Sequence, residues 1–454
     1  MKYQLINKPN KNFSAIQQIL YNRGIAENEI LHYINLSDED INSPLLLGEE
    51  NLKEALSRIL HAITFKKKVL IIVDCDCDGY TSAALLINYL YKIFPTWVEN
   101  YVDWYMHDGK QHGLNDCINF ILQENYSLIL CPDSSSNDYN EHKLLTEKDI
   151  DVVVLDHHLA DRISSDAVII NNQLSDYPNK ELSGVGIVWQ FCRYIDMVLE
   201  TNYANDFLDL VALGNCGDMM SLRSFETRYL ITKGFKKENI KNPFIDYMLD
   251  KNSFPLSKAD YISSDPNTSC TSMGAAFFIV PFVNAITRSG TLEEKHLLFN
   301  SMLNHKAFEE VLSNKRGHKL GEKEKLILQA IRTATNVKNR QTRAEDAGLA
   351  MLENMIEVNH MLDHKILLFL LEPGQIDAEI RGLIANKFMA KYQRPCCLLT
   401  KVIKRKEVLI QGKTTTDNRY VYPHKEDEIF ACSGPGYKIN GVVWGSGIEE
   451  IITY

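Results

Sequence analysis

The chain has 454 residues, of which 45% are hydrophobic and 24% are charged. This length exceeds what one hydrophobic core usually supports, so we expect two or more domains. The composition is typical of a soluble globular protein, and no run of residues is long and apolar enough to cross a bilayer. The net charge of −10 argues against a broad surface that coats nucleic acid, although it leaves room for a narrow basic channel.

The N-terminal sequence MKYQLINKPNKNF has neither the apolar stretch nor the small-residue cleavage pattern of a secretory signal peptide. We therefore expect a cytoplasmic protein, and we treat residues 1–60 as an N-terminal helical segment. The ten cysteines are scattered and form no C-x-x-C pair, which argues against a structural zinc site.

Four short apolar runs in the first half of the chain predict strands of a parallel sheet that is covered on both faces. They are residues 69–73, 128–130, 152–155 and 168–170. Between the first two runs, residues 81–94 place apolar side chains at helical spacing, and further helical blocks begin near Ser183 and at NDFLDLVALGN. Strands that alternate with helices predict an α/β domain, which we assign to residues 61–290.

The composition changes after this domain. Residues 291–360 are highly charged, poor in glycine and proline, and helically patterned, so they predict helices that connect two domains. Beyond them, KILLFLLEPG and RPCCLLTKVI are predicted strands on either side of a helix at RGLIANKFMAKY. Residues 361–454 are therefore predicted to form a second, smaller α/β domain.

Acidic residues and two histidines directly follow the predicted strands of the first domain. They are Asp74, Asp76 and Asp78 after the first strand, Asp133 after the second, and Asp156, His157 and His158 after the third. Ligand sites of parallel sheets lie at the carboxyl ends of the strands, so we expect these side chains to converge. Taken singly, Asp78-Gly79 is usually a turn and paired histidines are usually solvated.

The convergence of several carboxylates has a chemical consequence. Carboxylates held together repel one another and raise one another's pKa, and hard divalent cations offset that cost. Ligation by oxygen with one or two imidazoles favours Mn²⁺ or Mg²⁺. Asp218, which follows a helical segment and a glycine, is a further candidate ligand. The pattern predicts a two-metal centre of the kind that activates water for phosphoryl displacement.

The motifs, in this order, resemble those of the DHH phosphoesterase superfamily and, within it, the RecJ-like single-strand exonucleases, with some likeness to a phage-type variant. The matching segments are DCDCDGYTSA (74–83), CPDSSS (131–136), DHH (156–158), LSGVGIVWQF (182–191), ALGNCGDMMSL (212–222), PFVNAITRSG (281–290) and RGLIANKFMAKYQRP (381–395). The resemblance implies a DHH catalytic domain joined by helices to a smaller DHHA1-like domain. We expect that domain to lack the family's C-terminal GGH motif and the OB-fold that follows it.

The resemblance also implies roles for individual residues. The implied metal ligands are Asp76 on one ion, Asp78, His157 and Asp218 on the other, Asp133 between the two, and Asp74 in place of a histidine that many relatives have at the position of Ile72. The implied catalytic residues are His158, which would face the scissile phosphate, and Asp156, which would orient its neighbours.

The resemblance implies a further set of substrate contacts. They are Tyr80, Thr81 and Ser82 at the start of a helix, His112 in the loop GKQHGL, Asn284 and Arg288 in PFVNAITRSG, and Ser433 and Gly434 in ACSGPGYKING. N–H groups at a helix start favour phosphate. For His112, an ordinary exposed loop histidine is an equally good interpretation.

Basic residues in the connecting segment predict a second kind of nucleic-acid contact. Lys323, Lys325, Arg332, Lys338, Arg340 and Arg343 are candidates to line a groove that contacts a nucleic-acid backbone. Because acidic residues are interleaved with them, a solvated helix face is the competing interpretation. Aromatic residues near the first motif, including Tyr91 and Trp104, are either a base-stacking platform or part of the core.

Three functional hypotheses follow. The first is a 5′→3′ exonuclease on single-stranded DNA that uses two Mn²⁺ ions, with Mg²⁺ as an alternative, and that would suit DNA repair or recombination. The second is a nanoRNase or a cyclic-dinucleotide phosphodiesterase. The third is a non-catalytic RecJ-like scaffold, against which the retention of all the acids and both histidines argues. The partner predicted is single-stranded nucleic acid, with no membrane, and the sequence identifies no protein partner.

Overall fold

The computed structural model describes residues 6–109, 111–259, 265–372 and 374–402, together with short strands between residues 429 and 453. For residues 400–402 and for those later strands, the description covers the backbone only. The chain divides into two compact units, residues 1–335 and 336–454, which are described separately. The boundary falls inside the long helix α16 (Leu326–Val358) and thus inside the predicted connector.

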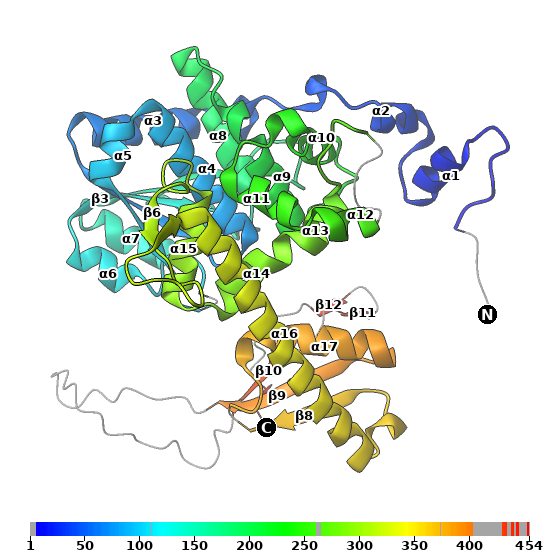
Figure 1. Cartoon of the computed structure of the whole chain (residues 1–454). Coiled ribbons are helices and arrows are strands. Elements are labelled where there is room, and N and C mark those ends of the chain that lie inside the picture. The colour runs from blue at the N-terminus through cyan, green and yellow to red at the C-terminus, as the bar shows by residue number, and fades with distance from the viewer. Residues whose placement is uncertain are drawn as a thin grey trace. The chain divides into compact units, whose positions relative to one another are not determined.

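A five-stranded, fully parallel sheet forms the centre of the first unit (Figure 1). Its strands are β1 (Lys68–Val73), β2 (Val102–Met106), β3 (Tyr126–Pro132), β4 (Asp151–Asp156) and β5 (Val168–Asn171). The order across the sheet is β2-β1-β3-β4-β5, so β1 lies between β2 and β3. The four strands predicted from the sequence are confirmed, and β2 is an additional edge strand.

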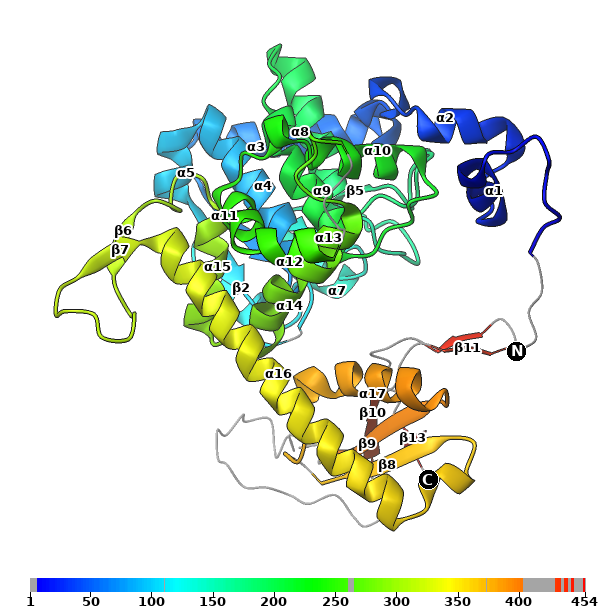
Figure 2. The same cartoon turned by 45° about the vertical axis from the view of Figure 1, so that its right-hand side comes forward.

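Helices cover both faces of this sheet (Figures 1 and 2). They include α3 (Glu49–Thr64), α4 (Cys77–Ile93), α6 (Ile118–Gln123), α7 (Tyr139–Thr146) and α8 (Gly184–Leu199). On one face, Leu70 and Ile72 of β1 share a core with Ile121 of α6 and Leu145 of α7. On the other face, α4 and α8 pack against the sheet and against each other. Burial on both faces explains why β1 reads as a continuous apolar run.

The rest of the first unit is mainly helical. Its helices are α1 (Ala15–Asn22), α2 (Ile30–Ile34), α5 (Pro95–Tyr101), α9 (Leu208–Gly217), α10 (Phe225–Gly234), α11 (Pro243–Lys251), α12 (Ser253–Lys258), α13 (Ser272–Phe278), α14 (Val280–Ser289) and α15 (Leu292–Met302). Between α15 and α16, β6 (Glu310–Leu312) and β7 (Lys323–Lys325) form an antiparallel hairpin. The predicted connector is therefore not helical throughout, and Lys323 and Lys325 lie on a strand of this hairpin.

The second unit has an α/β core of its own. Its strands are β8 (Leu367–Leu371), β9 (Cys396–Val402), β10 (Ile429–Ser433), β11 (Tyr437–Ile439), β12 (Val442–Trp444) and β13 (Ile452–Thr453). One sheet has the order β13-β10-β9-β8, in which β8 and β9 are parallel, and β11 pairs with β12. Helix α17 (Ala378–Tyr392) contributes Ile384 and Phe388 to a core with Phe369 of β8 and Leu352 of α16. The predicted strand-helix-strand arrangement is confirmed.

None of the helices in the described part of the chain combines the length and the apolar character that a membrane span requires.

Candidate metal centre

The acidic residues that follow the strands converge at the carboxyl edge of the parallel sheet. Asp74 follows β1, Asp133 follows β3, and Asp156 ends β4. Asp218 comes from a different element, because it directly follows α9 and caps the C-terminus of that helix. Although 144 positions separate the first and last of these residues, the parallel sheet and its helices bring them to one place.

The first turn of α4 positions two of the carboxylates. Asp76 is the N-cap of α4, and its side chain accepts a hydrogen bond from the N–H of Gly79 at 3.0 Å. Asp78 is buried and accepts hydrogen bonds from the start of α8: from the Ser183 hydroxyl at 3.0 Å and from the Gly184 N–H at 2.6 Å. The N-terminus of α8 therefore fixes the carboxylate of Asp78.

Two glycines are required by this close packing. A Cβ atom at Gly79 would lie 2.5 Å from the Cβ of Asp74, and a Cβ atom at Gly184 would lie 2.2 Å from Oδ1 of Asp133. Real Cβ atoms do not approach other atoms so closely. Neither position can take a side chain unless the carboxylates move.

Asp133 and His157 lie at the middle of the cluster. Asp133 has a left-handed backbone conformation, with φ of 65°, and its N–H donates to the carbonyl of Leu155 at 2.8 Å. The Nε2 atom of His157 lies 3.3 Å from Oδ1 of Asp133, 3.5 Å from Oδ2 of Asp218 and 3.9 Å from Oδ2 of Asp78. One imidazole nitrogen thus faces three carboxylates.

The ligand atoms fall into two adjoining groups. One group is Asp74, Asp76 and Asp133, and the other is Asp78, His157 and Asp218; within each group the ligand atoms lie within 4.8 Å of one another. Asp133 also groups with His157 and His158, so it adjoins both sets. Oxygen donors with one imidazole suit Mn²⁺ and Mg²⁺. The Oδ1 atoms of Asp74 and Asp133 are buried and accept no hydrogen bond in the described part of the chain, as expected of atoms that would face a cation.

The electrostatics of the cluster also favour a bound divalent cation. Burial, followed by the charges of Asp78, Asp76 and Asp74, raises the pKa of Asp133 well above its ordinary value. Burial and the neighbouring acids raise the pKa of Asp218 to about 7. These carboxylates are therefore costly to ionise together, and a divalent cation would remove that cost.

Asp156 and His158 form a separate hydrogen-bonded pair beside the cluster. Asp156 accepts hydrogen bonds from Nδ1 of His158 at 2.7 Å and from the backbone N–H groups of His157 at 2.7 Å and Ser136 at 3.1 Å. Burial opposes ionisation of Asp156, but these donors outweigh it and leave its pKa below the ordinary value. The hydrogen bond to Asp156 raises the pKa of His158 to about 9, so its half-exposed ring is an imidazolium at neutral pH.

The predicted substrate contacts at the start of α4 need a correction. The helix begins at Cys77, and Tyr80 already donates its N–H to the carbonyl of Asp76 at 3.1 Å. Tyr80, Thr81 and Ser82 are buried, and the ring of Tyr80 packs against Phe299. Because Asp76 caps the helix earlier than predicted, these three side chains point into the core, and their placement does not support contact with a substrate.

His112 lies at the acidic cluster. Its Nδ1 atom is 2.7 Å from Oδ2 of Asp74, and this hydrogen bond, with that to Cys75, raises the pKa of His112 to about 11. The ring also lies beside the thiol of Cys75, which the sequence pattern did not single out. A contact between residues 38 positions apart has no local sequence signal.

The remaining predicted substrate residues are not seen in contact with the acidic cluster. Asn284 and Arg288 are half-buried on α14. This helix packs against α4, which carries Asp78, and against α9, which Asp218 directly follows. Within the described part of the chain, neither side chain contacts a carboxylate of the two ligand groups. Ser433 is described only as backbone of β10, and Gly434 lies outside the described residues.

The basic residues of the predicted connector are largely paired with neighbours. Arg332 lies 2.9 Å from Glu324, Lys338 lies 3.9 Å from Glu345, and Lys323 lies 3.7 Å from Glu310. These contacts favour the interpretation of a solvated, charge-balanced surface over that of a positive groove. The aromatic residues are mixed: Tyr89 and Trp97 are buried, whereas Tyr91 stacks on His305.

The fold and this edge of the sheet define the class of α/β phosphoesterases that carry a DHH triplet. Residues 68–215 match the model of the DHH family, N-terminal domain. The chain is 34% identical over 433 residues to the "Putative SPbeta prophage-derived single-strand DNA-specific exonuclease YorK" of Bacillus subtilis (strain 168). This match covers 94% of the chain and 70% of the relative. The chain is 25% identical to the single-stranded-DNA-specific exonuclease RecJ of Bacillus subtilis (strain 168), over 85% of this chain and 44% of RecJ.

Solved structures agree on the fold. A crystal structure of exonuclease RecJ bound to manganese matches with a TM-score of 0.57 and 18% identity, over 77% of this chain and 80% of that one. RecJ of Thermus thermophilus in complex with Mn²⁺ matches with a TM-score of 0.56 and 19% identity, over 77% of this chain and 46% of that one. The chain therefore belongs to the DHH family of hydrolases and, within it, to the RecJ-like nucleases.

Proposed function

We propose that the protein is a two-metal exonuclease that digests single-stranded DNA from the 5′ end. The observation that carries this proposal is the pair of adjoining ligand groups at the carboxyl edge of the sheet. Each group has three side chains suited to a hard cation, and Asp133 adjoins both. The names of YorK and RecJ support the choice of single-stranded DNA, and the RecJ structures with manganese support the choice of ion.

In this proposal, Asp74, Asp76 and Asp133 would hold one ion, and Asp78, His157 and Asp218 would hold the other. Bound ions of this kind activate water and stabilise charge on the oxygens of a phosphodiester. The residues of the chain keep the ligands in place: the start of α8 orients Asp78, and the backbone of Leu155 orients Asp133.

His158 would act on the substrate itself. Its ring is positively charged at neutral pH and is held by Asp156, so it can donate a hydrogen bond from Nε2 to a phosphate oxygen. Negative charge accumulates on those oxygens as the phosphodiester is cleaved, and a fixed imidazolium stabilises it without reorganising. Asp156 acts through His158 and is a positioning residue.

A second candidate function is the hydrolysis of dinucleotides. The pairing of Arg332, Lys338 and Lys323 with acids removes part of the positive surface that a long strand would need. A dinucleotide needs only the metal centre and its immediate surroundings. The sequence resemblance to RecJ-like nucleases favours the longer substrate.

The test is a digestion assay with Mn²⁺ and a 3′-labelled single-stranded DNA oligonucleotide of roughly ten to thirty nucleotides. Digestion from the 5′ end gives a ladder of labelled products that shorten with time, whereas digestion from the 3′ end releases the label at once. Asp133→Asn should abolish the ladder. Asp151→Asn is the matched control, because Asp151 lies at the opposite end of β4 and is half-exposed.

A two-nucleotide RNA and a cyclic dinucleotide are assayed in parallel. Hydrolysis of these alone would overturn the proposal in favour of the dinucleotide phosphodiesterase. Absence of hydrolysis of every substrate, with the protein folded and Mn²⁺ present, would favour a non-catalytic scaffold.

A further inference from the structure

A lysine in the core of the first unit has no part in the proposed mechanism. Lys295 lies near the start of α15 and is 1% exposed. Lysine is rarely buried so completely, because its ammonium gives up hydration that the protein must replace with hydrogen-bond acceptors. A buried ammonium therefore ties together the elements that supply its acceptors.

The ammonium of Lys295 joins α15 to the chain that follows β2. Its Nζ atom donates to the carbonyl of His107 at 3.0 Å and to the carbonyl of Asp108. Strand β2 ends at Met106, where its last pairing with β1 also lies. The two carbonyls are thus just beyond the paired part of the sheet, and Lys295 supplies donors where the strand pairing has ended.

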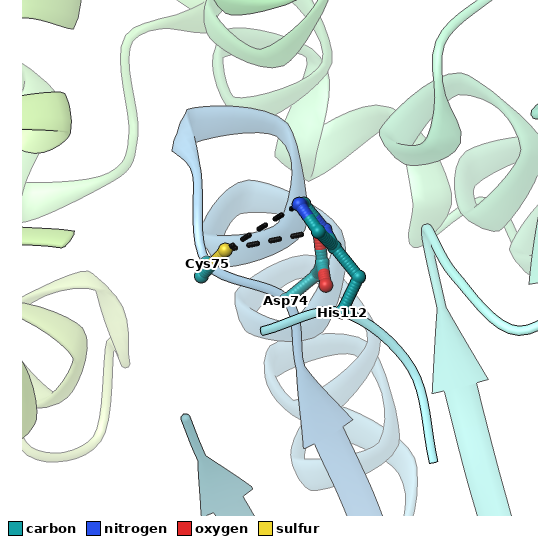
Figure 3. Close-up of side chains that lie close together, drawn as sticks. All are labelled: Asp74, Cys75 and His112. Carbon is teal, nitrogen blue, oxygen red and sulfur yellow. Dashed lines mark hydrogen bonds and ion pairs between the residues drawn. The ribbon is translucent and has the colours of Figure 1, made fainter. Parts of the chain in front are cut away.

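His107 and Asp108 begin the loop that carries His112 to the acidic cluster. The Nδ1 atom of His112 lies 2.7 Å from Oδ2 of Asp74, and Figure 3 shows the ring beside the turn that bears Asp74 and Cys75. Asp74 belongs to the first ligand group of the proposed metal centre. Hydrogen-bond partners of metal ligands orient those ligands. His112 is therefore placed to orient the carboxylate of Asp74.

This loop is anchored at both of its ends. Its start is held by Lys295, and its end is held by Asp138, whose Oδ2 atom accepts a hydrogen bond from the N–H of Leu114 at 2.8 Å. The side chain of His112 is 61% exposed, so packing does not fix it. The place of His112 beside Asp74 therefore depends on the two backbone anchors.

We propose that Lys295 is a positioning residue of the metal centre. Its ammonium fixes the start of the loop, the loop presents His112, and His112 holds Asp74 in the orientation in which it would bind a cation. This role rests on the proposed function, because it requires the metal centre. A lysine that only supported the fold would lower the free energy of unfolding and leave the Mn²⁺ affinity of the folded chain unchanged.

The test measures Mn²⁺ binding to the folded chain, without nucleic acid, from the loss of the electron paramagnetic resonance signal of free Mn²⁺. Lys295→Met keeps most of the side-chain volume and removes the ammonium. It should weaken Mn²⁺ binding by about 10-fold, at the lower end of what changes to the partners of metal ligands cause. Hydrogen exchange of the backbone N–H groups in residues 111–114 should become faster in the same variant.

A double-mutant cycle shows whether Lys295 acts through His112. His112→Ala should weaken Mn²⁺ binding by about 10- to 100-fold. The variant with both changes should bind Mn²⁺ as weakly as His112→Ala alone, because its loop has no imidazole left to position. The control is Ile59→Ala, which leaves a cavity behind α3 where that helix packs against β3 and β5. It should lower stability and leave the Mn²⁺ affinity of the folded chain unchanged.

Wild-type affinity for Mn²⁺ in folded Lys295→Met would overturn this role of Lys295, and so would losses that simply add in the double variant. If Lys295→Met does not fold, Lys295→Leu, which also lacks a donor, decides by the same measurement. Equal Mn²⁺ binding by wild type and variant, with intact DNA digestion, disproves the role of Lys295 alone. Weaker binding in the variant, with no hydrolysis of any substrate by the wild type, supports that role and disproves the nuclease. A wild type that binds no Mn²⁺ disproves both.

Discussion

The acidic edge of the sheet and the basic connector are both regions of dense charge, but they are built in opposite ways. At the edge, five carboxylates form two adjoining groups, three of them face His157, and burial with mutual repulsion raises the pKa of Asp133 and Asp218. In the connector, Arg332 pairs with Glu324 and Lys338 with Glu345. Charge that is balanced within the chain needs no further explanation. Charge that is concentrated and left uncompensated marks the place where a ligand of opposite sign belongs.

The largest effect should come from removing a carboxylate at the junction of the two ligand groups. We expect Asp133→Asn to lower the rate of Mn²⁺-dependent digestion by more than about 100-fold, since even partners of metal ligands cost 10- to 100-fold when mutated. The same variant should lose the thermal stabilisation that Mn²⁺ gives to the wild type, which is about 2.7 kcal/mol for one site at a concentration 100 times its Kd. Digestion assays and thermal unfolding with and without chelator measure both. An equal stabilisation by Mn²⁺ in wild type and variant would contradict the assignment.

The next effect concerns the close packing behind the acids. Gly184→Ala places a methyl carbon 2.2 Å from Oδ1 of Asp133, so Asp133 or the start of α8 must shift. We expect a loss of about 1–3 kcal/mol in the free energy of unfolding and a loss of digestion that exceeds what this destabilisation explains. Chemical denaturation and the digestion assay separate the two losses. Gly382→Ala is the control, because among the described residues no atom outside the helix's own backbone lies within 4 Å of a Cβ at that position. Wild-type activity in Gly184→Ala would show that the packing is looser than the structure indicates.

A smaller effect is expected in the pH dependence. Asp156 raises the pKa of His158 to about 9, so the protonated ring predominates below that pH and is lost above it. If the imidazolium assists the reaction, kcat/KM should fall as the pH rises through about 9. In Asp156→Asn the hydrogen-bond partner that raises this pKa is no longer charged, and the alkaline limb should move towards the ordinary histidine value. If kcat/KM of Asp156→Asn falls at the same alkaline pH as that of the wild type, the ionisation of a group other than His158 causes the fall.

The same pair has a consequence for stability. The pKa of His158 is higher in the folded chain than in the unfolded one, so its contribution is fully present below about pH 6.5 and is lost as the pH rises through about 9. Asp156 has a lowered pKa in the folded state, and its contribution is present at neutral pH and is lost in acid. The metal-free wild type should therefore lose stability relative to Asp156→Asn both at high pH and in acid. Equilibrium unfolding across this pH range checks the signs.

The smallest effect is expected in the connector. Because Arg332 is paired with Glu324, Arg332→Gln should change the affinity for single-stranded DNA by less than about twofold and leave its salt dependence unchanged. A residue that contacts phosphate would instead reduce the slope of log K against log salt by about one. Filter-binding or fluorescence titrations at several salt concentrations distinguish the two. A reduced slope would restore the hypothesis of a basic groove and would weaken the contrast between the two regions.

The features predicted from the sequence are those with a local signal. Buried strands such as β1 read as continuous apolar runs, and the acids that follow them sit at a known edge of a parallel sheet. Strand β2 was not predicted, because Asp103 interrupts the apolar character of this five-residue edge strand. The start of α4 was predicted too late because the helical spacing of apolar residues was taken from Thr81 onwards, whereas the helix begins at Cys77.

The contacts that complete the site could not be predicted, because they join residues that are distant in the chain. Ser183 donates to Asp78 across 105 positions, and His112 meets Asp74 across 38. Neither contact leaves a periodic or compositional trace. The pairing of Lys338 with Glu345 is closer in sequence, but whether such a pair forms depends on side-chain geometry that spacing alone does not fix.

The wide separation of the ligands along the chain has a consequence for biosynthesis. The two ligand groups draw on residues from Asp74 to Asp218, and Asp78 is oriented by a helix that starts 106 positions later. A chain that leaves the ribosome from its N-terminus holds the first three aspartates long before α8 and Asp218 have been translated. The group that contains Asp218 cannot close until about half of the polypeptide has emerged. If the chain is the two-metal nuclease proposed above, it could not cleave nucleic acid near its own ribosome until the domain that would enclose the ions has folded.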